Sequence, residues 1–296
     1  MADASRDPSD SVLVRTLLRW YDRNERPLPW RTTTPWGVLV SEFMLQQTPV
    51  DRVLPVWQAW LDRWPTPADL AAAPGGEAVR AWGRLGYPRR ALRLHQAAQA
   101  ITAQHGGQVP SDPDALRALP GVGEYTAAAV QAFAFDRRAV VLDTNVRRVV
   151  ARVVHGQAQP RAHLTAAERE RAEQLWPRTH RRSARWSAAV MEFGALVCTA
   201  RAPSCGGCPV RGSCRWLLAG QPPAAEPARR QAEYVGSDRQ ARGRIMAVLR
   251  ERPEPVPASA IVAAWPDDPQ RERALAGLIG EGLVCCTSDG RYALPG

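Results

Sequence analysis

LPGVGEYTAAAVQAFAFDRRAVVLDTNVRR, residues 119–148, is the stretch of this 296-residue chain that decides its fold. It opens with the turn Gly121-Val122-Gly123, in which two glycines permit positive φ and let a ligand approach the backbone closely. An alanine-rich helix is expected next, and after a short apolar run Asp143 begins another helix. Because unpaired amides and the helix dipole at a helix start favour an anion, this turn can seat a phosphate, although such turns also serve as plain connections between helices.

Helical patterns continue on both sides of this stretch. Apolar residues recur at helical spacing, and Pro and Gly separate the segments. The helices predicted in this way span residues 11–23, 37–47, 50–64, 67–73, 77–85, 88–105, 112–118, 146–154, 165–175 and 184–196. No alternating strand pattern occurs before residue 280, so the fold class is mainly α.

Composition divides the chain into four parts. Residues 1–10 are expected to be disordered, and residues 11–216 form the main helical domain. Residues 217–236 are expected to be a linker, because their Pro- and Ala-rich centre cannot bury a core. Residues 237–296 predict three short helices, at 240–250, 258–264 and 270–280, and a strand pair around an Asp-Gly turn. That pattern resembles a small winged-helix domain, and a helical cap on the main domain is the alternative.

The charge of the chain favours a nucleic-acid partner. Its net charge is +10, and all 39 basic residues are arginine, whose planar fork suits phosphate. A GC-rich genome would explain arginine in place of lysine, but not the excess of bases over acids. Without lysine, the chain lacks the usual amine for a Schiff base with a sugar. No apolar run is long enough for a membrane span and no secretory signal is visible, so a cytoplasmic protein is expected, associated with the nucleoid if the source is bacterial. A monomer is also expected.

Four of the six cysteines are closely spaced, as Cys198-x6-Cys205-x2-Cys208-x5-Cys214. In a cytoplasmic protein such spacing indicates a metal site rather than disulfides. Structural zinc usually draws on two close cysteine pairs, and only Cys205 and Cys208 form one. Four thiolates also suit a [4Fe–4S] cluster, which is the favoured interpretation, with zinc as the alternative.

Two carboxylates stand in contrasting surroundings. Glu42 lies within the apolar helix VLVSEFML, where lost solvation would raise its pKa and keep it protonated. Asp143 begins a helix, where amide donors and the dipole favour its charged form. Taken alone, Glu42 could equally be a surface residue and Asp143 a simple N-cap. Two such carboxylates can divide the work of glycoside-bond cleavage, in which the leaving group is protonated and a sugar cation is stabilised.

These motifs together resemble the MutY-type adenine DNA glycosylases of the endonuclease III, or helix-hairpin-helix, superfamily. The resemblance rests on Trp30-Arg31 followed by SEFMLQQT (41–48), on LPGVGEYTA (119–127), on VLDTNVRRV (141–149) and on the cysteine spacing. It covers residues 11–216 with the motifs in the family's order. It implies a helix-hairpin-helix glycosylase fold whose cluster loop, residues 198–214, closes the domain.

The resemblance also implies roles for individual residues. Glu42 would donate a proton to adenine at N7 and assist the attacking water, and Asp143 would stabilise the oxocarbenium ion. Tyr125 stands where relatives that cut the strand carry a lysine, and with Asn145 it would position the carboxylates and the flipped nucleotide. The implied adenine-pocket residues are Trp30, Arg31, Leu45 and Glu192; the implied DNA contacts are Gln46 and Gln47 near the orphan base, and Tyr87, Gly121, Val122, Gly123, Arg147 and Arg201. The carbonyls of Leu119 and Val122 could hold a monovalent or divalent cation.

The expected function is therefore that of a monofunctional enzyme that excises adenine opposite guanine or 8-oxoguanine in double-stranded DNA. A thymine or uracil mismatch glycosylase and a non-catalytic lesion-binding protein are the alternatives. Glu42 argues against the first, and the presence of both carboxylates in register argues against the second. The chain departs from the family pattern twice. The family's LGYY reads Leu85-Gly86-Tyr87-Pro88 here, so proline replaces the wedging tyrosine. The residues after the linker are also too few for the family's 8-oxoguanine-sensing domain, which leaves the preferred opposite base open.

Overall fold

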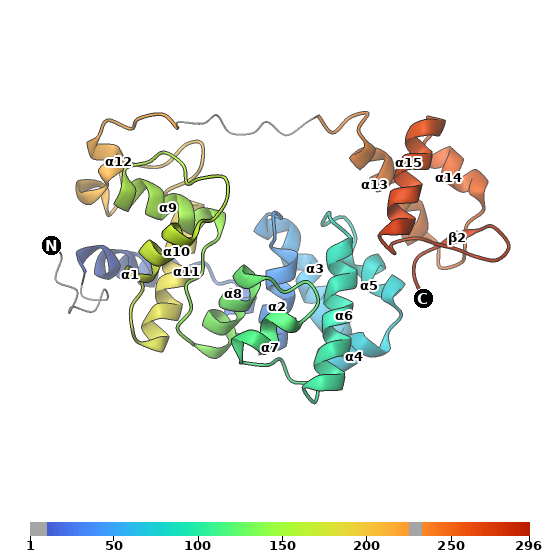
Figure 1. Cartoon of the computed structure of the whole chain (residues 1–296), viewed down its shortest axis with the longest axis horizontal. Coiled ribbons are helices and arrows are strands. Elements are labelled where there is room, and N and C mark those ends of the chain that lie inside the picture. The colour runs from blue at the N-terminus through green and yellow to red at the C-terminus, as the bar shows by residue number, and fades with distance from the viewer. Residues whose placement is uncertain (1–10, 225–232) are drawn as a thin grey trace. The chain divides into compact units, whose positions relative to one another are not determined.

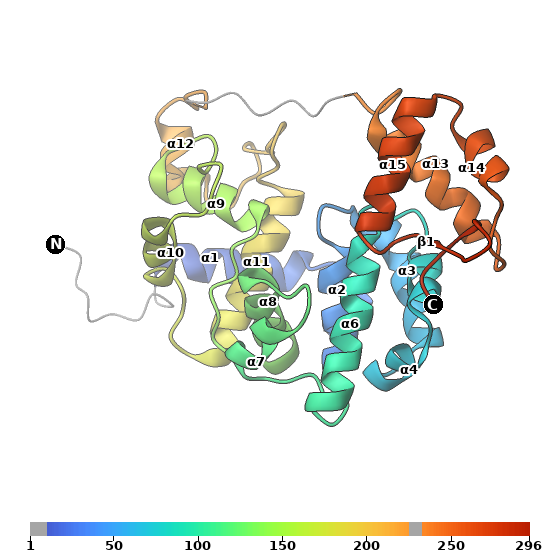
Figure 2. The same cartoon turned by 45° about the vertical axis from the view of Figure 1, so that its right-hand side comes forward.

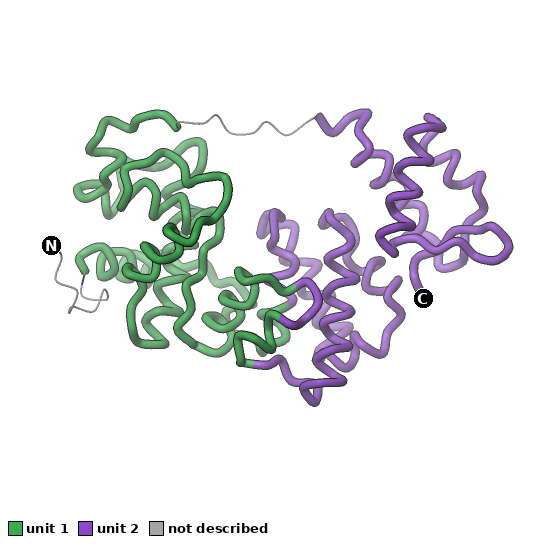
Figure 3. The backbone as a smooth tube through the Cα atoms, in the orientation of Figure 1, with its two compact units in different colours: residues 1–39, 111–117, 122–228 green, residues 40–110, 118–121, 229–296 purple. Residues whose placement is uncertain are grey.

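The computed structural model describes residues 11–224 and 233–296, so the expected disordered segment 1–10 and the centre of the expected linker lie outside it. The chain divides into two compact units, each assembled from segments far apart in the sequence (Figure 3). The described parts of unit 1 are residues 11–39, 111–117 and 122–224, and those of unit 2 are residues 40–110, 118–121 and 233–296. The hairpin turn predicted from the sequence therefore joins one unit to the other.

Unit 1 is a set of helices around an apolar core (Figure 1). Its elements are α1 (Val12–Asn24), the 3-10 turn η2 (Pro29–Arg31), the start of α2 (Pro35–Met44), α7 (Pro113–Ala118), α8 (Glu124–Phe135), α9 (Thr144–His155), α10 (Ala166–Glu173), α11 (His180–Leu196), the 3-10 turn η3 (Arg211–Ser213) and α12 (Arg215–Leu218). In the core, Trp176 meets Trp186 edge to face with ring centroids 6.2 Å apart, and Trp20 meets Phe193 at 5.3 Å. These contacts hold α11 in place beside α1 and α9, and α9 is the helix that begins after Asp143.

Unit 2 has a core rich in tryptophan. Its elements before the linker are the end of α2, α3 (Val50–Arg63), α4 (Pro67–Ala72), α5 (Gly75–Trp82) and α6 (Arg89–Gln104). Trp60 of α3 is fully buried between Trp64 and Trp82, at centroid distances of 4.7 and 5.8 Å. Packing of α6 against α4 and α5 brings the turn between α5 and α6 close to the end of α2, as the hydrogen bonds described below demonstrate.

The C-terminal part of unit 2 has the elements that the sequence predicts. They are α13 (Asp238–Glu251), α14 (Ala258–Ala264), α15 (Asp268–Gly280), β1 (Cys285–Cys286) and β2 (Tyr292–Ala293), seen together in Figure 2. The strands pair antiparallel, with Cys285 opposite Ala293. This module also contacts α5, because the Gly76 amide donates to the Pro295 carbonyl (2.6 Å) and Arg80 binds the carbonyl of Leu249 (3.4 Å). The module therefore has the predicted elements and contacts α5, and its assignment as a winged-helix domain stays a prediction.

The main-α prediction is confirmed, and the predicted helices agree with the structure to within a few residues. Three short elements were not predicted, namely η2, η3 and α12, because three or four residues are too few to display a helical period. The expected linker begins inside α12, and the chain then returns to that helix, where the Trp216 indole donates to the Pro222 carbonyl (2.8 Å). Over the residues that the structure describes, no helix combines the length and the apolar character that a membrane crossing requires.

Candidate active site and metal centre

Asp143 is the N-cap of α9. Its carboxylate accepts hydrogen bonds from the Val146 amide (2.6 Å) and from the side chain of Asn145 (2.9 Å). The sequence predicts that this cap favours the charged form, and both bonds do act in that direction. Burial outweighs them, however, and the pKa of Asp143 is raised above its ordinary value. The cap bonds that the sequence predicts are therefore present, and burial, which removes the carboxylate from water, opposes them.

A chain of hydrogen bonds leads from Asp143 to the cysteine loop. The Asn145 amide nitrogen binds Asp143, and its oxygen accepts from the guanidinium of Arg148 (2.8 Å). Arg148 is buried, and it also donates to the carbonyls of Gly194 (2.7 Å) and Cys198 (2.8 Å). Gly194 has no room for a side chain, since a Cβ there would lie 2.8 Å from that of Asn145. The orientation of the aspartate is thus tied to the first cysteine of the metal loop.

Tyr125, on the first turn of α8, lines a cavity of about 270 Å³ in unit 1. The other lining residues are Glu124, Val140, Leu142, Leu164 and Arg169. Glu124 and Arg169 form an ion pair beside it. Leu142 directly precedes Asp143 in the sequence, so the cavity and the aspartate belong to the same part of unit 1.

Glu192 is buried on α11, with only 3% of its side chain exposed, and two arginines hold it. Arg26 donates to both carboxylate oxygens (2.8 and 2.7 Å) and adds its own amide (3.0 Å), while Arg31 lies 3.2 Å away. Burial alone would raise the pKa of Glu192, but these partners prevail and the pKa is lowered. The expected neighbours Arg31 and Glu192 are therefore in contact, and Trp30 is buried beside Arg31 in the chain. Arg26 was not foreseen.

Glu42 is buried near the end of α2, with 5% exposure, as its apolar sequence context predicts. Its interpretation as a surface glutamate is wrong. The chain leaves α2 through Leu45 and Gln46, which are half-buried, and reaches Gln47, which is exposed and has a positive φ of 55°. The loop that follows Glu42 therefore presents a glutamine to solvent on a constrained backbone.

The two glycines of the hairpin turn differ in backbone conformation and in surroundings. Gly121 has a φ of 81°, and a Cβ there would lie 2.7 Å from the Cβ of Arg93. Gly123 has an ordinary φ of −92°, so the expectation of positive φ at both glycines is wrong for it. It is the N-cap of α8, no side chain caps that helix start, and the space where its Cβ would stand is open. That opening suits an anion approaching the first amides of α8.

The four closely spaced cysteines line one cavity of unit 1, together with apolar residues such as Phe193 and Trp216. All four are free thiols, with Cys198 and Cys214 buried. Among the residues described, no three potential ligands lie close enough together to hold a single metal ion. Four thiols that line one cavity fit a [4Fe–4S] cluster, in which each thiolate binds a different iron.

Buried arginines surround the first cysteine. Arg152, one turn after Arg148 on α9, donates to the Cys198 sulfur (3.6 Å) and to the carbonyls of Thr199 (2.7 Å) and Ala200 (3.0 Å). Its guanidinium also lies 4.5 Å from the ring centroid of Trp216. Burial raises the pKa of Cys198, and the bond from Arg152 opposes that shift by favouring the thiolate.

The expected DNA contacts divide into exposed and engaged residues. Tyr87 and Arg201 are exposed, as a DNA-binding role requires. Arg147 is different, because it is 11% exposed, its guanidinium binds both oxygens of Glu168 (2.6 and 2.8 Å), and it donates to the carbonyl of Arg161 (2.8 Å). These partners occupy Arg147 in joining α9 to α10, so we assign it no phosphate contact. A cation at the carbonyls of Leu119 and Val122 stays a prediction.

Comparisons with known proteins agree with this arrangement. A family model of HhH-GPD superfamily base excision DNA repair proteins matches residues 40–177, and one of the iron–sulfur binding domain of endonuclease III matches residues 198–214. An adenine DNA glycosylase of Mycobacterium tuberculosis is 52% identical over 284 residues, which cover 95% of this chain and 92% of that protein. The chain belongs to the adenine DNA glycosylase family. Its cysteine loop binds a [4Fe–4S] cluster, for which the four thiols at 198, 205, 208 and 214 are the fitting ligands.

Other relatives match a smaller share of this chain. The human adenine DNA glycosylase is 38% identical, but the match covers 71% of this chain and 40% of that protein. A solved thermostable thymine-DNA glycosylase is 30% identical, with a TM-score of 0.63 over 70% of this chain and 96% of that one. Endonuclease III in a non-covalent complex with DNA, at 24% identity and a TM-score of 0.60, shares the fold. The match to the Mycobacterium tuberculosis glycosylase covers nearly the whole chain, whereas these three matches cover about 70% of it.

Proposed function

We propose that this chain is a monofunctional adenine DNA glycosylase, which flips adenine out of a mispair with guanine or 8-oxoguanine and hydrolyses its N-glycosidic bond. The observation that carries the proposal is the buried carboxyl of Glu42 in a chain 52% identical to an adenine DNA glycosylase. A purine can be protonated at N7, so a buried acid has a use with adenine that it lacks with thymine.

The two carboxylates divide the chemistry. Glu42 protonates the leaving adenine at N7 and then assists the attacking water, while ionised Asp143 stabilises the positive charge that develops on the sugar. Asn145 and Arg148 hold Asp143 in one orientation, and Tyr125 positions the nucleotide from its cavity. The mechanism requires both carboxylates to reach one extruded nucleotide, since a base inside the duplex is not accessible.

The same chemistry explains why strand cleavage is not expected. A glycosylase that also cuts the strand attacks the sugar carbon with an amine, usually that of lysine. This chain has no lysine, and Tyr125 stands where strand-cutting relatives are expected to carry theirs. A phenol cannot form a Schiff base, and the N-terminal amine is the one primary amine of the chain, so we expect hydrolysis by water with an intact abasic strand as product.

DNA is held by the main domain in this proposal. Residues 237–296 carry eight arginines and eight carboxylates, so the +10 charge of the chain arises elsewhere. Several of those arginines are also paired, as in the contacts of Arg242 with Glu281 (2.6 Å) and of Arg273 with Asp238 (3.6 Å). A neutral module of this kind adds little attraction to phosphate, which favours packing on α5 over DNA binding. A monomeric, cytoplasmic enzyme stays the expectation.

Single-turnover release from three duplexes tests the proposal, with adenine opposite 8-oxoguanine, adenine opposite guanine, and thymine opposite guanine, each followed by alkali treatment. Adenine release from either of the first two is expected, and untreated strands should stay intact. Release of thymine alone, or binding without release, would overturn the adenine assignment. Glu42→Gln should lower the rate by about 100- to 10,000-fold while duplex affinity is kept, and the exposed Glu170→Gln serves as its control.

A further inference from the structure

Two exposed residues of unit 2 hold an unusual backbone conformation on neighbouring loops. Gln47, in the turn between α2 and α3, has a φ of 55°, and Tyr87, in the turn between α5 and α6, has a φ of 48°. A non-glycine residue rarely adopts positive φ, and the surrounding structure must hold it there. The Tyr87 side chain is 56% exposed, so burial of its ring is not the reason for this conformation.

One guanidinium joins the two loops. Arg90, on the first turn of α6, donates from Nη1 to the carbonyls of Phe43 (2.8 Å) and Gln46 (2.7 Å) at the end of α2. Its Nη2 donates to the Gly86 carbonyl (3.1 Å), directly before Tyr87. The planar fork of arginine is what allows one side chain to bind both loops at once.

The charge of Arg90 is matched to these acceptors. The carbonyls at the end of α2 have no partners within the helix, and they form the negative end of its dipole, where a cation is favoured. The guanidinium also lies 5.3 Å from the ring centroid of Trp82 and 5.4 Å from that of Tyr87. Burial lowers the pKa of Arg90 to about 10, which leaves it charged at neutral pH. Arg90 thus acts as a C-cap for α2 that is supplied by another helix.

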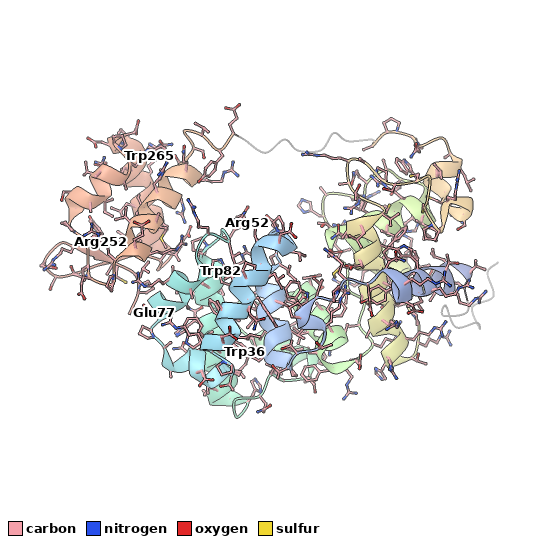
Figure 4. All side chains as sticks on the ribbon, turned by 180° about the vertical axis from the view of Figure 1, so that it is seen from behind. Trp36, Arg52, Glu77, Trp82, Arg252 and Trp265 are labelled. Atoms are coloured by element: carbon pink, nitrogen blue, oxygen red, sulfur yellow. The ribbon has the colours of Figure 1, made fainter. Side chains whose placement is uncertain are left out.

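Further side chains reinforce the same junction. The buried Thr48 hydroxyl lies 3.3 Å from both the Gln46 and the Leu85 carbonyls, one in each loop. The Trp82 indole donates to the Gly86 carbonyl (2.9 Å), and Arg52 of α3 donates to the Arg84 carbonyl; Trp82 and Arg52 are labelled in Figure 4. The backbone on either side of Gln47 and Tyr87 is therefore fixed by several bonds, while both side chains stay at the surface.

We propose that Arg90 is a positioning residue that braces Gln47 and Tyr87 into one rigid wedge for insertion into the DNA base stack. The inference rests on the proposed function. A glycosylase must separate its target from the stack and fill the gap, and a wedge does this best when it is held in place before DNA arrives. Proline at position 88 cannot stack as a tyrosine would, so Tyr87 and Gln47 together supply the inserted side chains.

The test uses the full-length variant Arg90→Met, in which the side chain keeps its length but loses the guanidinium fork. Arg89→Met is the control, because Arg89 is the neighbouring arginine and is exposed. Adenine release is measured in single turnovers from a paired duplex with 8-oxoguanine and from a duplex whose adenine is an unpaired bulge. A 2-aminopurine beside the target reports unstacking. Arg90→Met should slow release from the paired duplex about tenfold or more and reduce the fluorescence rise, with a much smaller effect on the bulge. Arg89→Met should match the wild type on both duplexes.

An equal loss on both duplexes would mean that Arg90 only supports the fold, and no loss on either would mean that it supports nothing in the reaction; each result overturns the inference. If circular dichroism finds Arg90→Met unfolded, Arg90→Lys replaces it. That variant keeps the charge, but one ammonium cannot bind both loops as the fork does, so an intermediate loss confined to the paired duplex is expected. If the wild-type protein unstacks 2-aminopurine but releases no adenine, the proposed function is overturned, while the inference about the wedge still stands.

Discussion

Replacing Glu192 by glutamine tests how much the buried carboxylate between Arg26 and Arg31 contributes to stability. Glutamine keeps the shape and one acceptor oxygen, but its amide turns donors toward a guanidinium. Removing one member of a fully buried pair costs about 3–5 kcal/mol. Arg26 and Arg31 are 34% and 23% exposed, so water can replace part of the lost interaction. We therefore expect a loss nearer the cost of a charged hydrogen bond, about 2 kcal/mol.

The pH dependence of this effect has a definite sign. The pKa of Glu192 is lowered in the folded protein, so its contribution is present above the unfolded value of about 4.3 and is lost as pH falls through the folded value. Wild type should therefore exceed Glu192→Gln in stability from pH 7 to pH 5, and the difference should shrink below that range.

Urea titrations followed by circular dichroism at several pH values measure the difference. Glu173→Gln is the matched control, because Glu173 forms an ion pair with Arg138 but is 49% exposed, and such pairs contribute about 0–1 kcal/mol. If Glu192→Gln loses no more stability than Glu173→Gln, or if the difference is unchanged at low pH, the assignment of Glu192 as a buried, ionised centre fails.

Three further predictions concern the aspartate, the C-terminal module and the hairpin. Burial raises the pKa of Asp143, so its ionisation lowers the free energy of unfolding as pH rises from the unfolded pKa of about 3.9 through the pKa in the folded protein. Asp143→Asn should therefore release no adenine and be at least as stable as the wild type at pH 7. A less stable variant would contradict this prediction. Gly76→Ala places a Cβ 2.5 Å from the Pro295 carbonyl and should cost about 1–3 kcal/mol in thermal unfolding, whereas Gly75→Ala, with its nearest neighbour at 3.5 Å, should cost clearly less. Tyr125→Lys should add strand nicking that borohydride traps as a protein–DNA adduct, and abasic strands that stay intact would remove Tyr125 from the position beside the sugar.

The sequence alone was sufficient to predict the long helices and the metal-binding loop. Apolar spacing and the Pro and Gly punctuation located nearly every long helix, because those signals are local. The cysteine spacing pointed to a cluster because four ligands from one short loop need little information from the rest of the fold. The burial of Glu42 was also foreseeable, since seven apolar or small neighbours surround it in the sequence.

The arginines that organise the site could not be predicted in the same way. Arg26, Arg90 and Arg148 bind carbonyls or carboxylates that lie far away in the sequence, so their partners exist only after the helices pack. In a chain with 39 basic residues, each of them is indistinguishable from a solvated surface charge. The raised pKa of Asp143 was missed for a related reason, because a cap is a local feature and desolvation is not.

The hydrogen bonds of Arg90 make the backbone position of the two loops independent of the side chains that accept nothing from it. Its acceptors in both loops are main-chain carbonyls, which every amino acid supplies. A substitution at 46, 47 or 87 that tolerates the local backbone would therefore change a side chain of the proposed wedge and keep the carbonyl acceptors of Arg90. The side chains of the proposed wedge can therefore vary while a single arginine keeps the two loops in register.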